Sequence, residues 1–148
     1  MANAYKTLRN KHQDEVNAFP MFFCFDRKQF EEGMATLGLG PNDTDKIYSF
    51  GNTGGYFKRT DAPRLHEMLD RHENERKEAM ASDKTGVGYI YDMFCYQLSN
   101  HEYAYTMNAE PALDALDLTL EDVEKNPVLS KAFQRAKKNA LSDDAFAV

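Results

Sequence analysis

The spacing of apolar residues along the chain predicts mostly helices. Leu8, His12 and Val16 recur at intervals of four in a stretch without glycine or proline, which predicts a polar surface helix over residues 4–17. The other predicted helices begin at cap residues or prolines and carry apolar stripes. They cover residues 27–37, 62–82, 89–100 and 127–141, with a further helical start at the capping-box pattern of residues 119–122. Five or six helices therefore account for most of the chain.

Short aromatic runs predict a small sheet beside these helices. Residues 19–25 are rich in phenylalanine, which is typical of a buried strand. Residues 46–50 and 56–59 are strand candidates that the glycine-rich turn 51–55 joins into a hairpin, and residues 102–106 predict a short edge strand. The expected fold is α+β, with a small, mostly antiparallel sheet of three to five short strands covered by five or six helices.

Length and composition favour one intracellular domain. The 148 residues match a single domain, 1–148, with a core that needs neither a metal ion nor a disulfide. Two cysteines are too few for a disulfide framework and favour a reducing compartment. The N-terminus lacks an apolar signal segment, and the longest apolar run falls far short of the ~20 residues that cross a bilayer. We therefore expect a cytoplasmic protein that does not bind membranes.

The acidic balance of the chain limits its partners. With 24 acidic and 18 basic residues, the net charge is −6. Affinity for the phosphate backbone comes from clustered lysine and arginine, so we expect no direct binding of nucleic acid. The same charge suits docking onto a basic surface of another protein, because complementary potentials speed the encounter. A protein partner is the expectation that follows, and a homo-oligomer remains open.

Tyrosines are concentrated in one segment. Five of the eight lie between positions 89 and 105. Tyrosine combines an apolar ring with a hydroxyl group that needs a hydrogen bond, so it is common both at interfaces and in cores. The broad apolar face of helix 89–100 predicts a core position for that face, whereas Tyr96, Tyr103 and Tyr105 are candidates for a contact surface.

Two further groups of polar residues are candidates for a site. His101 and Glu102 are an imidazole and a carboxylate in adjacent positions, the components of an acid–base pair, although neighbours on an extended segment point to opposite faces. His72 and Arg76 interrupt the apolar stripe of helix 62–82. Either they face a pocket or partner, with arginine binding a carboxylate or phosphate, or the helix extends beyond its core there.

No metal ion or cofactor is expected from these patterns. His66 and His72 are six positions apart, which places their rings about 240° apart around a helix. Two ligands that diverge in this way cannot share a tetrahedral site. The chain also lacks a nucleophile elbow and a cysteine–histidine signature, so no catalytic residues are assigned.

Three sequence blocks resemble a known family. They are residues 17–23 (NAFPMFF), residues 37–49 (LGLGPNDTDKIYS), and the sequence IYDMF at 90–94 followed by NHEY at 100–103. Together they resemble an uncharacterised family, a domain of unknown function, encoded by gut bacteria and their phages or mobile elements. The resemblance implies a bacterial or phage cytoplasmic origin, and small acidic proteins of such elements often inhibit host defence machinery.

These observations rank the functional hypotheses. The leading hypothesis is a non-catalytic acidic interaction protein, with inhibition of a host defence enzyme as its specific form. The alternative is a small-ligand or nucleotide-binding protein that uses Arg76, His72 and the tyrosines. A hydrolase that uses His101 and Glu102 is the third hypothesis.

Overall fold

The computed structural model describes residues 3–142, and its contacts divide the chain into two compact units. We call residues 1–10 with 75–148 the helical unit and residues 11–74 the sheet unit. Helices α1 (Ala4–Ala18) and α3 (Ala62–Ser82) contribute residues to both units. The expectation of a single domain therefore stays a prediction.

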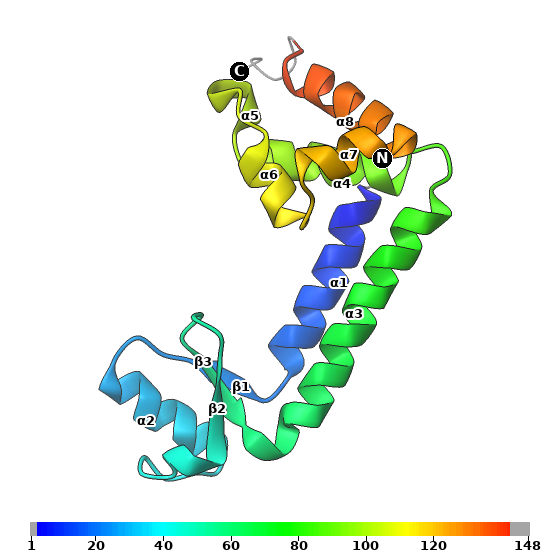
Figure 1. Ribbon diagram of the computed structural model, residues 1–148. Coiled ribbons are helices and arrows are strands. Elements are labelled where there is room, and N and C mark those ends of the chain that lie inside the picture. Colours follow the sequence, from blue (N-terminus) through cyan, green and yellow to red (C-terminus); the bar gives the residue numbers. More distant parts are fainter. Residues whose placement is uncertain (1–2, 143–148) are drawn as a thin grey trace. The chain divides into compact units, whose positions relative to one another are not determined.

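The elements of the chain are drawn in Figure 1. Between α1 and α3 lie β1 (Met21–Phe23), α2 (Arg27–Thr36), β2 (Ile47–Phe50) and β3 (Gly55–Lys58). After α3 come α4 (Tyr89–Asn100), α5 (Tyr103–Thr106), α6 (Glu110–Ala115), α7 (Leu120–Lys125) and α8 (Pro127–Ala140). The predicted α+β fold is confirmed. Within residues 3–142 no helix is both long and apolar enough to cross a bilayer.

The sheet unit is built on three antiparallel strands in the order β1-β3-β2. Phe22 lies opposite Tyr56, and Met21 lies opposite Phe57, so the pleat sends these pairs to opposite faces. One face carries Phe22 into an apolar cluster with Met34 of α2, and the other carries Phe57 into a cluster with Leu65 of α3. Both faces of this small sheet are therefore used for packing.

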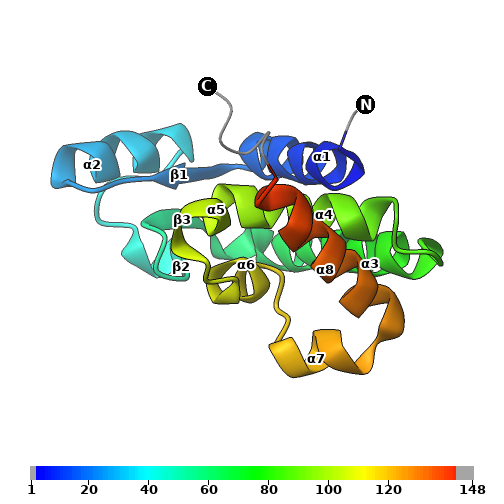
Figure 2. The same ribbon diagram turned by 90° about the horizontal axis from the view of Figure 1, so that it is seen from above.

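The helical unit has its core around α4. Phe94 of α4 and Phe133 of α8 are each 1% exposed, and their ring centroids lie 5.2 Å apart. Figure 2 shows α4 and α8 side by side in this unit. The predicted capping box is present at α7, where Thr119 Oγ1 accepts from the Asp122 N–H and the Asp122 carboxylate accepts from the Thr119 N–H. These local signals define helix starts accurately.

The predicted edge strand at residues 102–106 is wrong, because α5 forms there instead. Glu102 and Met107 both adopt left-handed backbone angles, with φ of 56° and 58°, and they enclose a single helical turn. Tyr103, at the start of this turn, is buried against the core. Because the Tyr103 ring packs into the core, the segment forms a tight helical turn and not an extended edge strand. Residues 103–125 thus supply three short helices, and the described residues 3–142 contain eight α-helices in all.

Candidate functional site

The segment of residues 101–124, which includes α5, α6 and most of α7, is acidic. It contains Glu102, Glu110, Asp114, Asp117, Glu121, Asp122 and Glu124, and no lysine or arginine. Three large apolar side chains are nevertheless exposed here: Tyr105 is 77% exposed, Met107 60% and Leu120 53%. Met107 and Leu120 line one hollow of the surface, and apolar side chains exposed together are typical of a binding surface.

A groove lies among these residues. We call it the acidic groove; its cavity has a volume of about 430 Å³. Its lining comprises Tyr103, Met107, Asn108, Ala109, Glu110, Leu113, Asp114, Leu118, Thr119, Leu120, Phe133 and Lys137. Buried Leu113 and Phe133 are apolar parts of this lining, whereas Met107 and Leu120 are exposed parts of it. Exposed Glu110 and Asp114 add negative charge, and Lys137 lies over the ring of Phe133, 4.5 Å from its centroid. The groove thus combines apolar surface with an acidic border.

A second cavity, of about 340 Å³, lies along α5 and the end of α8. Glu102, Tyr103 and Tyr105 line it together with Cys95 and Asn139. Of the predicted site residues, these three are therefore brought together. The expected surface position of Tyr103 is wrong, because only 7% of it is exposed and its ring belongs to the core. Tyr105 does lie at the surface, and its role in binding stays a prediction.

Tyr96 is half-buried in an aromatic cluster of the helical unit. Its ring centroid lies 5.4 Å from that of Tyr5, and the guanidinium of Arg9 lies 5.4 Å from the same ring. The Tyr5 hydroxyl accepts a hydrogen bond of 2.8 Å from Nε2 of Gln97. Burial raises the pKa of the neighbouring Tyr89 to about 12. Most of the tyrosine segment thus serves the core, in agreement with the core position predicted for the apolar face of helix 89–100.

His101 and Glu102 form the connection between α4 and α5. The N–H of His101, at the end of α4, donates to the carbonyl of Gln97 over 3.0 Å, and the N–H of Glu102 donates to that of Ser99 over 3.1 Å. His101 is half-buried and Glu102 is exposed. These bonds give both residues a structural role in ending the helix. Catalysis by the pair stays a prediction.

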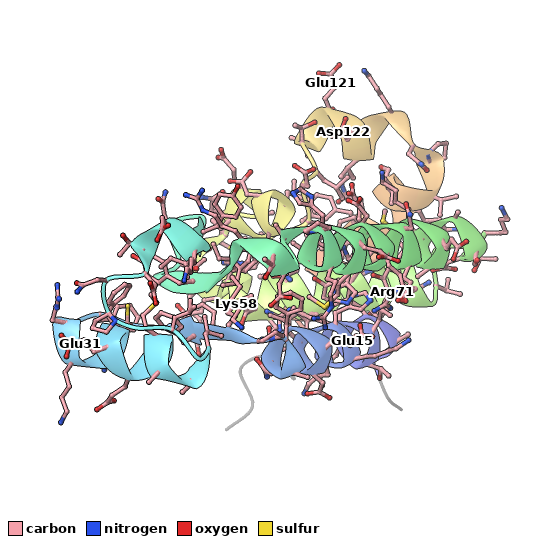
Figure 3. All side chains as sticks on the ribbon, turned by 90° about the horizontal axis from the view of Figure 1, so that it is seen from below. Glu15, Glu31, Lys58, Arg71, Glu121 and Asp122 are labelled. Atoms are coloured by element: carbon pink, nitrogen blue, oxygen red, sulfur yellow. The ribbon has the colours of Figure 1, made fainter. Side chains whose placement is uncertain are left out.

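A polar cluster in the sheet unit contains His72. Nε2 of His72 lies 2.6 Å from Oε2 of Glu15, and Nη2 of Arg71 donates to Oε1 of the same carboxylate over 2.7 Å. The ring of His12 stacks on that of His72, with centroids 3.9 Å apart and an interplanar angle of 16°. Figure 3 shows Glu15 of α1 and Arg71 of α3 directed toward each other. We call His12, Glu15 and His72 the histidine–glutamate cluster.

Burial and charge distinguish this cluster from a surface ion pair. His12 is 6% exposed and His72 is 2% exposed, whereas the Glu15 side chain is 31% exposed. Hydrogen bonds from Arg71 and then His72 hold the pKa of the Glu15 carboxyl below its usual range. His72 is therefore packed against α1, which excludes the interpretation that α3 extends beyond its core at this position. Arg76, one turn later, is exposed and belongs to the helical unit.

The histidine–glutamate cluster was missed by sequence analysis. The sequence pattern predicts a polar surface helix for His12, and it offers His66 as the histidine nearest to His72 along the chain. His66 is exposed. One signal was available, because His12 and Glu15 are three residues apart on a helix and must share a face. Their proximity to His72 follows only from the pairing of α1 with α3.

Comparison with known proteins identifies a family for the chain. A family model, "Family of unknown function (DUF7659)", matches residues 4–139. Because the match covers most of the sequence, the protein belongs to this family. The expected membership of an uncharacterised family is thereby confirmed, whereas an origin in gut bacteria or phages stays a prediction. No curated protein and no solved structure matches the chain significantly.

Proposed function

For this member of the DUF7659 family we propose a non-catalytic role: it binds another protein through the acidic groove. The occupant is a basic segment of the partner that also carries apolar side chains. The observation that carries this proposal is that Met107 and Leu120, both more than half exposed, line a 430 Å³ groove between α8 and the segment 101–124, which contains no lysine or arginine.

Charge and apolar area have separate parts in this binding. The seven acidic residues of 101–124 attract a basic segment and favour a fast encounter. Burial of the exposed Met107 and Leu120 side chains supplies the affinity, since apolar burial is the main favourable term in protein association. Lys137, the one cation among the described residues of the lining, fits an acidic or carbonyl group of the same segment. The net charge of −6 supports the same kind of partner.

The other functional hypotheses have less support from the geometry. The small-ligand hypothesis relied on His72 and Arg76, but His72 contacts Glu15 and Arg76 is exposed. The hydrolase hypothesis relied on His101 and Glu102, whose backbone groups end α4. Inhibition of a host defence enzyme is the specific form we propose for the interaction, by analogy with small acidic proteins of mobile elements.

Peptide binding to the full-length protein tests the groove. The probe is a fluorescent amphipathic peptide of lysine and leucine at helical spacing, with a glutamate-for-lysine version as its control. We expect the basic peptide to bind with an affinity that falls as salt is raised, because screening weakens charge attraction. The acidic peptide should bind at least tenfold more weakly. Fluorescence anisotropy measures both affinities.

Substitutions in the groove provide the decisive comparison. Met107→Asn with Leu120→Asn replaces two exposed apolar side chains without changing the charge, so the fold should persist while peptide affinity falls at least tenfold. Val87→Asn is the matched control, because Val87 is 57% exposed in the same unit but is not part of the groove lining. Circular dichroism checks the fold of each variant. Equal peptide affinity in the groove variant and the control would overturn the proposal.

A further inference from the structure

The histidine–glutamate cluster has the composition of a metal site. Two imidazoles and one carboxylate come from two helices: His12 and Glu15 from α1, and His72 from α3. Each offers one ligand atom, and these three atoms lie within 4.8 Å of one another. All three residues belong to the sheet unit, so their arrangement is set within one compact part of the chain.

The burial of the cluster is unusual for polar side chains. His12 and His72 are only 6% and 2% exposed, so packing positions both rings, and Nε2 of His72 already bonds the Glu15 carboxylate. The Glu15 carboxylate, at 31% side-chain exposure, forms the accessible side of the cluster. A small ion can therefore reach the cluster from the side of Glu15. The two histidine rings close the opposite side to solvent.

We propose that His12, Glu15 and His72 bind a divalent transition-metal ion, with zinc preferred. Two histidines and one glutamate, with a fourth position open to water, form one of the recurrent zinc-ligand sets. Imidazole nitrogen also suits copper and nickel, whereas calcium and magnesium require oxygen ligands. The donor set thus selects the transition metals over the alkaline-earth ions.

Metal binding requires side-chain movements, because the stacked rings of His12 and His72 must turn until a nitrogen of each points at the ion. A tetrahedral zinc ion with bonds of about 2.0–2.2 Å holds its ligand atoms about 3.3 Å apart. The ligand atoms of the cluster lie within 4.8 Å of one another, so no separation has to shorten by more than about 1.5 Å. The contact of 2.6 Å between Nε2 of His72 and Oε2 of Glu15 must lengthen by about 0.7 Å. Side-chain rotations about single bonds supply changes of this size.

An ion bound in the cluster takes the place of the proton in the hydrogen bond between His72 and Glu15. The carboxylate only accepts, so Nε2 of His72 carries the proton of this hydrogen bond. Coordination needs an unprotonated ring nitrogen, and the proton therefore moves to the other nitrogen or to solvent. Arg71 binds the opposite oxygen, Oε1, and so orients the carboxylate while leaving Oε2 for the ion.

Zinc titration of the full-length protein tests the proposal. After treatment with a chelator, calorimetry with zinc chloride should give one ion per chain, and zinc should raise the melting temperature because it binds the folded state. Cobalt(II) should give the strong visible absorption of tetrahedral coordination. Absence of heat, thermal shift and visible absorption up to millimolar metal would overturn the proposal.

Variants show whether the ion occupies the cluster. His12→Ala should weaken zinc binding at least ~100-fold, and Glu15→Gln at least ~10-fold, since removing a ligand costs no less than removing its supporting groups. His66→Ala is the matched control, because His66 is exposed on the same helix as His72. If His12→Ala does not fold by circular dichroism, the nearly isosteric Glu15→Gln decides. Unchanged zinc affinity in folded Glu15→Gln would overturn the assignment.

Discussion

The two units of the chain are stabilised in different ways. Among the described residues, the helical unit gathers fourteen buried apolar residues into one cluster around α4. The sheet unit has seven, divided into clusters of four and three on the two faces of its sheet. It adds polar contacts that the apolar clusters do not contain, such as the stacked rings of His12 and His72.

This difference shows how a small sheet compensates for a small core. A three-stranded sheet buries little apolar area, so its stability depends on close approaches and on satisfied polar groups. In the sheet unit these are the approach of Gly33 to Phe22 and the hydrogen bonds of Glu15 to Arg71 and His72. The helical unit instead depends on the volume that its core side chains fill.

Removal of a large side chain from the helical core should have the largest effect. Phe133→Ala deletes a ring that is 1% exposed and packs on Phe94. We expect a loss of about 3–5 kcal/mol in the free energy of unfolding, from lost burial and the cavity left behind. Urea denaturation followed by circular dichroism measures the loss, and hydrogen exchange with mass spectrometry shows which elements lose protection.

The pattern of hydrogen exchange tests whether the two units are stabilised by separate cores. If the units are held by separate cores, Phe133→Ala should lower protection in α4 and α8 more than in β2 and β3. Val87→Ala, at a 57% exposed position, should change stability by less than about 0.5 kcal/mol. Equal loss of protection in the helices and the strands would mean that the two cores unfold together.

A single methyl group should disturb the sheet unit. In Gly33→Ala the added Cβ would lie 2.1 Å from Cδ2 and 2.3 Å from Cγ of Phe22. Alanine in place of glycine favours a helix by about 1 kcal/mol, but this clash forces α2 away from the strand and costs more. We expect a net loss of about 1–3 kcal/mol, measured by urea denaturation.

An exposed position on the same helix provides the control. Glu32→Ala changes α2 without approaching the sheet and should stay within about 0.5 kcal/mol of the wild type. A Gly33→Ala variant more stable than the wild type would show that α2 shifts freely on the sheet. The close approach would then contribute nothing to the stability of this unit.

Local signals in the sequence predicted much of the fold. The bounds of α3 and α4 agree with the predicted helices at 62–82 and 89–100, because caps, prolines and apolar stripes are local. The hairpin agrees within one residue for the same reason. The short helices α5 and α6 were harder to predict, since Glu102, Met107 and Asp117, which flank them, take left-handed angles without being glycine. Tertiary packing, which the sequence pattern does not contain, holds them there.

The candidate sites were less accessible to sequence reasoning. Tyr105 was correctly placed at the surface, but Met107 and Leu120 were not recognised, because exposure of an apolar residue depends on its tertiary neighbours. The histidine–glutamate cluster joins residues 57 positions apart, Glu15 and His72. Besides the spacing of His12 and Glu15, a histidine in the apolar stripe of α3 was a second signal, because a buried polar residue requires a partner. The identity of that partner required the fold.

The smallest expected effect concerns the pH dependence of the helical core. Burial raises the pKa of Tyr89 from 10.0 to about 12, so between these values the unfolded chain loses a proton that the folded protein keeps. The contribution to stability is complete below pH 10 and is lost as pH rises through 12. Solvent near this partly buried group reduces the full linkage value, and we expect a loss on the order of 1 kcal/mol.

Tyr89→Phe isolates this contribution from the other groups that titrate at high pH. The variant keeps the ring in the core but has no proton to lose, so its unfolding free energy should fall less than that of the wild type between pH 10 and 12. Urea denaturation of both proteins at pH 8, where tyrosine is neutral in either state, gives the baseline effect of the hydroxyl. Parallel pH profiles for the two proteins would show that the Tyr89 hydroxyl reaches water in the folded state. The helical core would then be more open around α4 than its burial indicates, and the contrast with the sheet unit would be smaller.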